Sequence, residues 1–236
     1  MTIRSVVFLI LLTHFSTMWG YSQSITAPVS TNFYMETYNI RGKPFINPEA
    51  TNVEGSPLLN TEWGTGTVYF KDGAIAKGVE LKFNLEKNEL YFNRDGSLFL
   101  FNDPITSFRM NFSNVGKQFD VLFRSGYPTT GKLGPSTFFQ VLEDGAKFQL
   151  LDYRFSYLAD SYRYGGTAKK AFIEGEELYI YDVAFSRLIK IKRGEQGVVE
   201  SMPAELSSRI LSIAKSQRSK LKSNQDLMMM VEELNK

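Results

Sequence analysis

The sequence predicts a mainly β protein: a curved antiparallel sheet, or an open barrel or sandwich, of about 10–12 strands with two C-terminal α-helices. Two observations lead to this fold class. Residues 64–101 have the pattern of four strands joined by tight turns, and apolar and polar residues alternate along Val79–Asn84. After residue 195 the apolar period changes from two to 3.6 residues, as in amphipathic helices.

The turns within residues 64–101 contain the residues that tight hairpins need. Lys71-Asp72-Gly73, Glu86-Lys87-Asn88 and Arg94-Asp95-Gly96 each end in Gly or Asn, which tolerate a positive φ. The fourth strand, Ser97–Phe101, is apolar on both faces and needs a cover on each side. We expect it to lie where the sheet meets its second layer, either the helices or an opposing sheet.

Further alternating segments extend the sheet. Phe108–Phe112 and Phe119–Phe123 alternate apolar with polar residues, and more strands follow as far as Arg187–Lys192. Between them, Ser125–Ser136 is the longest loop rich in Gly and Pro. A loop of this length is either disordered or functional, and the sequence leaves both possibilities open.

Two amphipathic helices are predicted after the strands. Pro203 marks the start of the first, because the missing N–H of proline is harmless in a first turn. The second begins at a Ser223-Asn-Gln-Asp226 cap. Two helices alone bury too little surface to fold independently, so we expect them to pack on the sheet. The apolar residues that share a face are Leu206, Ile210, Ile213 and Ala214 in the first helix, and Leu227, Met230, Val231 and Leu234 in the second.

The N-terminus has the pattern of a cleaved signal peptide. Arg4 gives a positive start, Ser5–Phe15 is largely apolar, and Gly20 and Ser22 are the small residues before a cut at Gln23. A membrane anchor is the alternative, but an apolar run of about ten residues is too short to cross a bilayer. We expect an exported protein, periplasmic or secreted, without a transmembrane segment. Its expected parts are a signal peptide (1–22), a flexible polar leader (23–57), an antiparallel β domain (58–195) and a helical tail packed on it (196–236).

The composition narrows the possible function classes. The only histidine, His14, lies in the predicted signal peptide, and the chain has no cysteine. A mature chain without these residues lacks Ser-His-Asp and Cys-His triads, and sites where histidine or thiolate binds a metal. Cleavage would remove Arg4 from the 27 basic residues and no acid, leaving 26 basic against 25 acidic residues, which argues against nucleic acid as a partner. The composition therefore favours a protein that is not an enzyme and has no cofactor.

Several strand and turn motifs follow one another along the chain. They are Glu62-Trp-x-x-Gly66, Val79-x-Leu-Lys-Phe-Asn84, Asn88-x-Leu-x-Phe92, Arg124-x-Gly-Tyr-Pro128 and Phe138-Phe-x-Val-Leu-x-Asp-Gly145, followed by the two helices. Their order resembles a family of exported, uncharacterised proteins common in Bacteroidota. The resemblance covers roughly residues 58–235 and implies an envelope or secreted location. It implies no activity and no catalytic residues.

One stretch dense in aromatic and basic residues is the best candidate for ligand binding. Tyrosines that alternate out of a sheet can stack on sugar rings or cover an apolar ligand, and arginines can orient an anion. The alternative is that these rings only cover the sheet as cross-strand aromatic pairs. The candidate ligand-binding residues are Tyr127 in the long loop and Tyr153, Arg154, Tyr157, Tyr162, Arg163 and Tyr164.

Carboxylates are the remaining groups for acid–base chemistry, and no spacing along the chain selects a pair suited to glycoside hydrolysis. We therefore expect a non-catalytic binding or structural protein of the cell envelope, with an envelope protein, a glycan or a lipid as partner. The alternatives are a periplasmic carrier of a lipid or other apolar ligand in a cavity of the curved sheet, and a carboxylate-based hydrolase. The carboxylates considered are Asp103, Asp120, Glu143, Asp144, Asp152 and Asp160.

Overall fold

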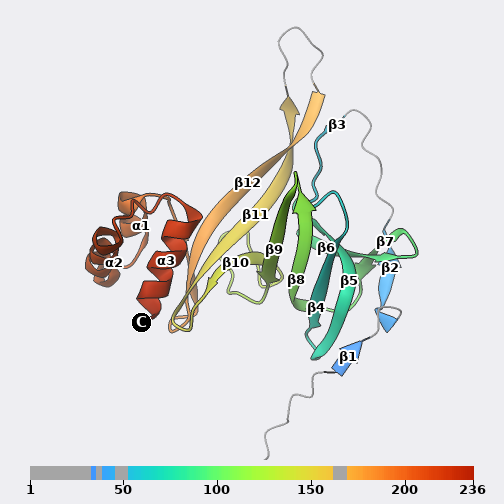
Figure 1. Ribbon diagram of the computed structural model, residues 1–236, viewed down its shortest axis with the longest axis horizontal. Coiled ribbons are helices and arrows are strands. Elements are labelled where there is room, and N and C mark those ends of the chain that lie inside the picture. The colour runs from blue at the N-terminus through green and yellow to red at the C-terminus, as the bar shows by residue number, and fades with distance from the viewer. Residues whose placement is uncertain (1–32, 36–38, 46–52, 162–168) are drawn as a thin grey trace, which may run out of the picture. The chain divides into compact units, whose positions relative to one another are not determined.

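A computed structural model describes residues 33–35, 39–45, 53–161 and 169–236, all within one compact unit (Figure 1). These residues form 13 strands in one open sheet and three helices, which confirms the predicted fold class. The strands are β1 (Phe33–Met35), β2 (Gly42–Pro44), β3 (Val53–Glu54), β4 (Gly64–Phe70), β5 (Ala74–Asn84), β6 (Glu89–Arg94), β7 (Ser97–Phe101), β8 (Ile105–Asn114), β9 (Lys117–Arg124), β10 (Phe139–Asp144), β11 (Phe148–Ser161), β12 (Lys169–Asp182) and β13 (Arg187–Ile191). The helices are α1 (Glu195–Ser201), α2 (Ala204–Gln217) and α3 (Asn224–Asn235).

The sheet follows the chain closely, since its strand order is β13-β12-β11-β10-β9-β8-β4-β5-β6-β7-β2. Most neighbours are antiparallel hairpins, as the tight turns predicted. Within the range predicted as a polar leader, three short strands join the sheet: β1 pairs with β5, β2 with β7 and β3 with β12. The turn residue Asn88 has a φ of 55° and Gly96 a φ of 78°, so these positions need residues that tolerate the left-handed region.

One face of the sheet, here called the inner face, carries two separate apolar cores. The first covers β4–β9 and includes Phe83, Phe108 and Phe123, all fully buried. The second lies between β10–β13 and the helices, and includes Leu150 and Met230. Residues paired across antiparallel strands share a face. The inner-face row that crosses both cores is Val68, Phe108, Phe123, Gln140, Asp152, Leu178 and Ile191.

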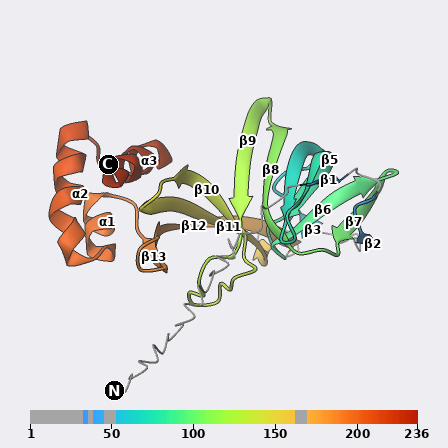
Figure 2. The same cartoon turned by 90° about the horizontal axis from the view of Figure 1, so that it is seen from below.

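The helices pack at one end of the strand order, beside β10–β13 (Figures 1 and 2). The expectation that the helices or an opposing sheet would cover Ser97–Phe101 is therefore wrong, because β7 lies near the opposite end of the order and the described strands form a single sheet. There Phe101 packs on Phe92 of the first core, with ring centroids 4.5 Å apart. On the other face Leu98 and Leu100 stay half-buried, so this strand needs no second layer of helices.

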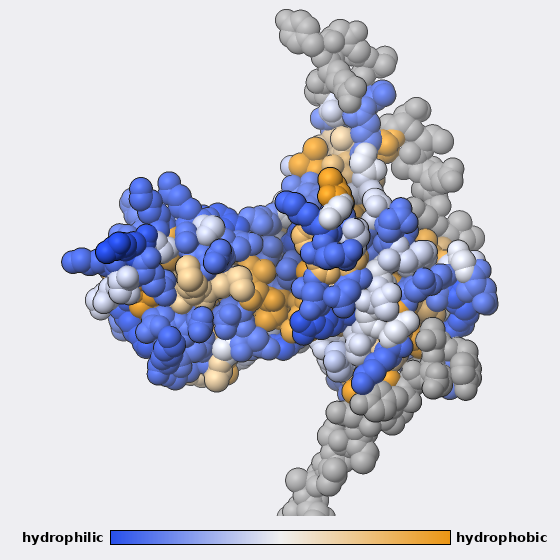
Figure 3. Space-filling view, in the orientation of Figure 1, coloured by the Kyte–Doolittle hydropathy of each residue, from blue (hydrophilic) through white to orange (hydrophobic). Residues whose placement is uncertain are grey.

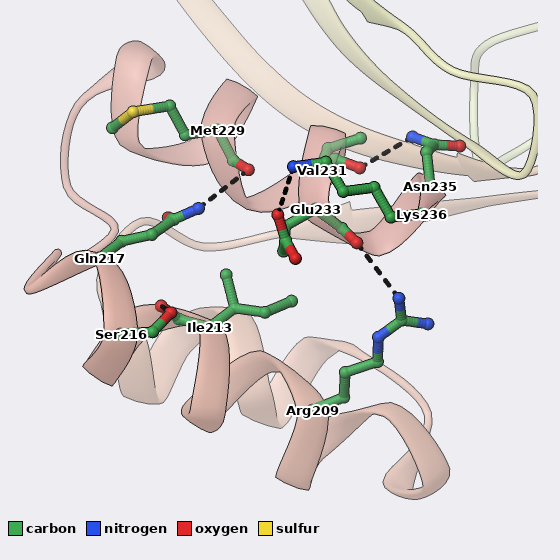
Figure 4. Close-up of polar contacts among 9 residues, drawn as sticks. All are labelled: Arg209, Ile213, Ser216, Gln217, Met229, Val231, Glu233, Asn235 and Lys236. Atoms are coloured by element: carbon green, nitrogen blue, oxygen red, sulfur yellow. Dashed lines mark hydrogen bonds and ion pairs between the residues drawn. The ribbon is translucent and has the colours of Figure 1, made fainter.

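Both predicted C-terminal helices are present, and α1 is additional. Ser223 and Asp226 form the predicted capping box at the start of α3. Two bonds join α2 to α3: Gln217 Nε2 donates to the Met229 carbonyl at 3.2 Å, and Arg209 Nη2 donates to the Glu233 carbonyl at 3.1 Å (Figure 4). The helical tail is thus a small packed layer on the second core.

Candidate functional site

The β11–β12 hairpin is the longest feature of the sheet. Its register runs without interruption from the pair Phe148–Asp182 to the pair Ser161–Lys169. β10 pairs with β11 only up to Asp152, and β13 pairs with β12 only from Leu178 onward. Beyond these points, residues 153–161 and 169–177 form a two-stranded segment, here called the arm. Among the described strands only β3 pairs with the arm, which extends past its neighbours in Figure 1.

Three aromatic residues follow one another along the outer face of the arm. Tyr153, Phe155 and Tyr157 form near-parallel rings, with centroids 5.5 and 6.3 Å apart and interplanar angles of 24° and 27°. We call them the aromatic stripe. Phe155 lies over Gly175 of β12, where an added Cβ would fall 2.4 Å from the ring. Tyr157 is 50% exposed, and its cross-strand neighbour Ile173 is 41% exposed. The stripe therefore ends in an apolar surface open to solvent.

The stripe continues a buried aromatic cluster at the base of the arm. Tyr153 contacts Phe139, whose ring also meets Tyr127 in an edge-on contact with centroids 5.5 Å apart. Tyr127 is buried, and its hydroxyl donates to Gln149 Oε1 at 2.9 Å. Burial raises the pKa of Tyr127 to about 12. Tyr127 is therefore placed to hold the loop against the sheet rather than to touch a ligand.

The loop at residues 125–136 has an internal hydrogen-bonded structure. The Gly126 N–H donates to the Pro135 carbonyl at 2.7 Å, and Thr130 and Leu133 exchange two backbone bonds of 3.0 Å. Leu133 packs on the aromatic cluster together with Tyr127. The loop is therefore ordered and packs on the outer face through Leu133, and its role in function stays a prediction.

Of the four remaining candidate residues, the structure describes only Arg154. Arg154 points to the inner face, because it alternates with Tyr153 and Phe155 along the strand, and its Nη2 donates to Glu174 Oε2 at 3.0 Å. The structure therefore separates Arg154 from the tyrosines with which it was grouped. Tyr162, Arg163 and Tyr164 lie outside the described residues.

A polar pocket of about 370 Å³ lies on the inner face between the two apolar cores. Asp152 and Arg154 of β11 line it together with Glu174 and Glu176 of β12, and Phe119 belongs to the opposite wall. Asp152 is only 3% exposed, and its Oδ1 has no hydrogen-bond partner in the described part of the chain. A buried carboxylate oxygen without a partner is costly and marks the pocket as unusual.

Two of the three carboxylates that line this pocket form ion pairs with arginines. Arg154 pairs with Glu174, and Arg193 Nη2 donates to Glu176 Oε1 at 2.5 Å. Asp152 has no such partner among the described residues. Burial, and to a smaller extent the nearby charge of Glu176, raise the pKa of Asp152 to about 6, although Arg154 and Arg193 oppose the shift.

The carboxylates considered for hydrolysis are mostly scattered. Asp103 pairs with Arg41, Asp120 with Arg109 at 2.6 Å, and Asp144 with Arg124 at 2.7 Å, while Asp160 is exposed. Asp103 also lines the larger cavity described below, whereas Asp152 lies in the polar pocket beside two glutamates that sequence reasoning did not select. The i, i+2 spacing of Glu174 and Glu176 places both on one face of a strand, and this spacing could have identified them as a pair from the sequence. In the described ranges, no cluster of three or more Asp, Glu, His or Cys residues is arranged to hold a metal ion.

A larger cavity of about 750 Å³ lies near β6, β7 and the end of the long loop. Its apolar lining includes Leu100, Phe101 and Phe138, and two lysines, Lys71 and Lys87, also line it. A cavity of this size is within the range that holds small molecules.

Comparisons with family models, with curated proteins and with solved structures found no match to this chain. The resemblance to exported Bacteroidota proteins therefore stays a prediction. None of the described helices has the length and apolar character needed to cross a membrane.

Proposed function

We propose that this chain is a non-catalytic, exported binding protein of the cell envelope, and that its arm binds a partner protein. The observation that carries the proposal is the apolar surface of the arm, where Tyr157 and Ile173 are both exposed. On the opposite face of the arm Leu158 is 40% exposed. Figure 3 shows apolar residues over the upper part of the β11–β12 hairpin, and a further apolar area between the helices and the sheet. Exposed apolar patches of this kind mark interaction sites.

The chemistry of the arm favours a protein over a glycan. The central outer-face pairs of the arm are Phe155 with Gly175, Tyr157 with Ile173, and Ala159 with Ala171, and the pairs at its two ends, Tyr153 with Glu177 and Ser161 with Lys169, are polar. In the central pairs, only the Tyr157 hydroxyl offers a side-chain hydrogen bond for a sugar hydroxyl. Protein interfaces, in contrast, are enriched in aromatic residues and depleted of charge at their centre. A two-stranded ribbon is also marginal in water, and a partner would stabilise it.

Co-purification from the native host tests this proposal. The tagged full chain should enrich one partner protein, and the double variant Tyr157→Ser with Ile173→Ser should lose it by roughly tenfold or more. The matched control is Phe185→Ser with Val115→Ser, since both residues are exposed and lie outside the arm. Equal recovery by the two double variants would refute the proposal. Export is tested in the same cells: the mature N-terminus should be Gln23.

The 750 Å³ cavity supports a second candidate function, the carrier of an apolar ligand. Leu100, Phe101 and Phe138 would contact an acyl chain, and Lys71 and Lys87 would attract an anionic headgroup. Native mass spectrometry of the purified chain should then show bound lipid that Leu100→Asp removes. Protein that is free of lipid when isolated from its host, and takes up none from vesicles, would eliminate this candidate.

A further inference from the structure

The polar pocket on the inner face contains a buried carboxylate, that of Asp152, with one oxygen that has no hydrogen-bond partner among the described residues. The two other carboxylates of the pocket, Glu174 and Glu176, are each bound by an arginine. Only 3% of the surface of Asp152 is exposed, and its Oδ1 accepts no hydrogen bond from the described residues. Protein interiors rarely contain such a group, because an unpaired buried charge costs several kcal/mol.

The wall opposite the acidic residues is apolar and aromatic. Phe112 and Phe119 stack with centroids 5.2 Å apart and an interplanar angle of 16°, and Phe119 is 39% exposed. Leu59 and Val121 complete this wall, and Asn224 at the start of α3 lies at another side. A ligand in the pocket would therefore meet a carboxylate on one side and apolar rings on the other.

We propose that this pocket is a binding site for a small molecule with a primary ammonium group on an apolar or ring-shaped body. The ammonium would donate to the Asp152 carboxylate, which lines the pocket, and would neutralise its charge. The apolar or ring-shaped body would pack against the rings of Phe112 and Phe119 on the opposite wall. The site is separate from the aromatic stripe, because Asp152 and the stripe belong to opposite faces of β11.

Benzylamine tests the proposal, with benzyl alcohol as its neutral counterpart of similar shape. Titration of the full chain, followed by NMR of backbone amides at pH 7.5, should show benzylamine shifting residues of β11 and β12 around Asp152. Benzyl alcohol should bind wild type at least about tenfold more weakly than benzylamine does. Benzylamine should bind Asp152→Asn at least about tenfold more weakly than it binds wild type. The matched control is Asp160→Asn, which alters an exposed aspartate of the same strand and should bind like wild type.

The pH dependence gives a second readout. The groups that act on Asp152 are Glu176, Arg154 and Arg193, and the pKa of Asp152 is about 6. Benzylamine affinity should fall as the pH is lowered through this value, because Asp152 loses its charge while the ammonium keeps its own. Asp152→Asn should show no such fall. The proposal is overturned if the two probes bind equally, if Asp152→Asn binds benzylamine like wild type, or if benzylamine at millimolar concentration shifts no amide near the pocket.

Discussion

Asp152 is a single residue that lowers the stability of the fold, because its carboxylate is buried. It lies in the row of inner-face residues between Gln140 and Leu178, at the boundary of the two apolar cores. Its pKa of about 6 in the folded chain exceeds the ordinary value of 3.8. The folded state therefore binds this proton more tightly than the unfolded state, and ionisation of Asp152 opposes folding.

The first prediction is that Asp152→Asn stabilises the protein at neutral pH. The loss of folding stability caused by the charged carboxylate is absent below about pH 4 and complete above about pH 6. A pKa shift of this size corresponds to about 3 kcal/mol. Urea unfolding should show Asp152→Asn more stable than wild type at pH 7.5, with the difference shrinking towards zero at pH 4. Asp160→Asn serves as the control. A stability difference that does not change with pH would contradict the explanation.

At the scale of elements, α3 is fixed to the sheet at its C-terminal end by one amide side chain. Asn235 Oδ1 accepts from the N–H groups of Lys147 and Phe148, and its Nδ2 donates to the carbonyls of Phe148 and Val231. Gly145 leaves room for this amide, since a Cβ there would lie 1.9 Å from Asn235 Nδ2. The helix position thus depends on Asn235 and Gly145 together.

The second prediction concerns this attachment. Asn235→Ala should lower the free energy of unfolding by about 1–3 kcal/mol, because backbone groups of Lys147 and Phe148 lose their partner. Ser208→Ala is the control, since Ser208 is exposed within α2 and should change stability by less than about 0.5 kcal/mol. Equal stability of the two variants in urea would show that the helix is held by apolar packing alone.

Local sequence patterns predicted most of the strands and helices, but they did not predict which residues far apart in the sequence come into contact. The period of two and the turn residues located β5–β9, and the Ser223–Asp226 cap located α3. The pattern missed α1, whose seven residues contain only one fully buried apolar side chain, Val198. The register that brings Arg154 beside Glu174 depends on the twisted β11–β12 pairing, which no local signal gives. The grouping of Arg154 with the tyrosines failed for a local reason, because Arg154 alternates with Tyr153 and Phe155 along β11 and so lies on the other face.

For the whole molecule, the division into two cores is the main feature. The sheet is continuous, but β9 and β10 share only two residue pairs, Arg124–Phe139 and Phe123–Gln140. The first core lies on one side of this junction, and the second core with the helices lies on the other. Regions with few shared contacts can open separately.

The third prediction is that the two cores lose protection independently. Met110 and Met230 are both fully buried, one in each core. Each Met→Ala substitution should cost about 2–5 kcal/mol. In hydrogen exchange, Met230→Ala should speed exchange in β11–β13 and the helices, and Met110→Ala in β4–β9. Uniform acceleration in both variants would mean that the protein opens as one unit.

The central claim is that the arm contacts a partner protein through Tyr157 and its neighbours. Site-specific photo-cross-linking in intact host cells tests it most directly, with the reactive residue placed at position 157 or, as control, at the exposed position 185. We predict one discrete adduct with a single protein from position 157, abolished by Ile173→Glu, and no such adduct from position 185. The same adducts from both positions, or none from position 157, would contradict the account.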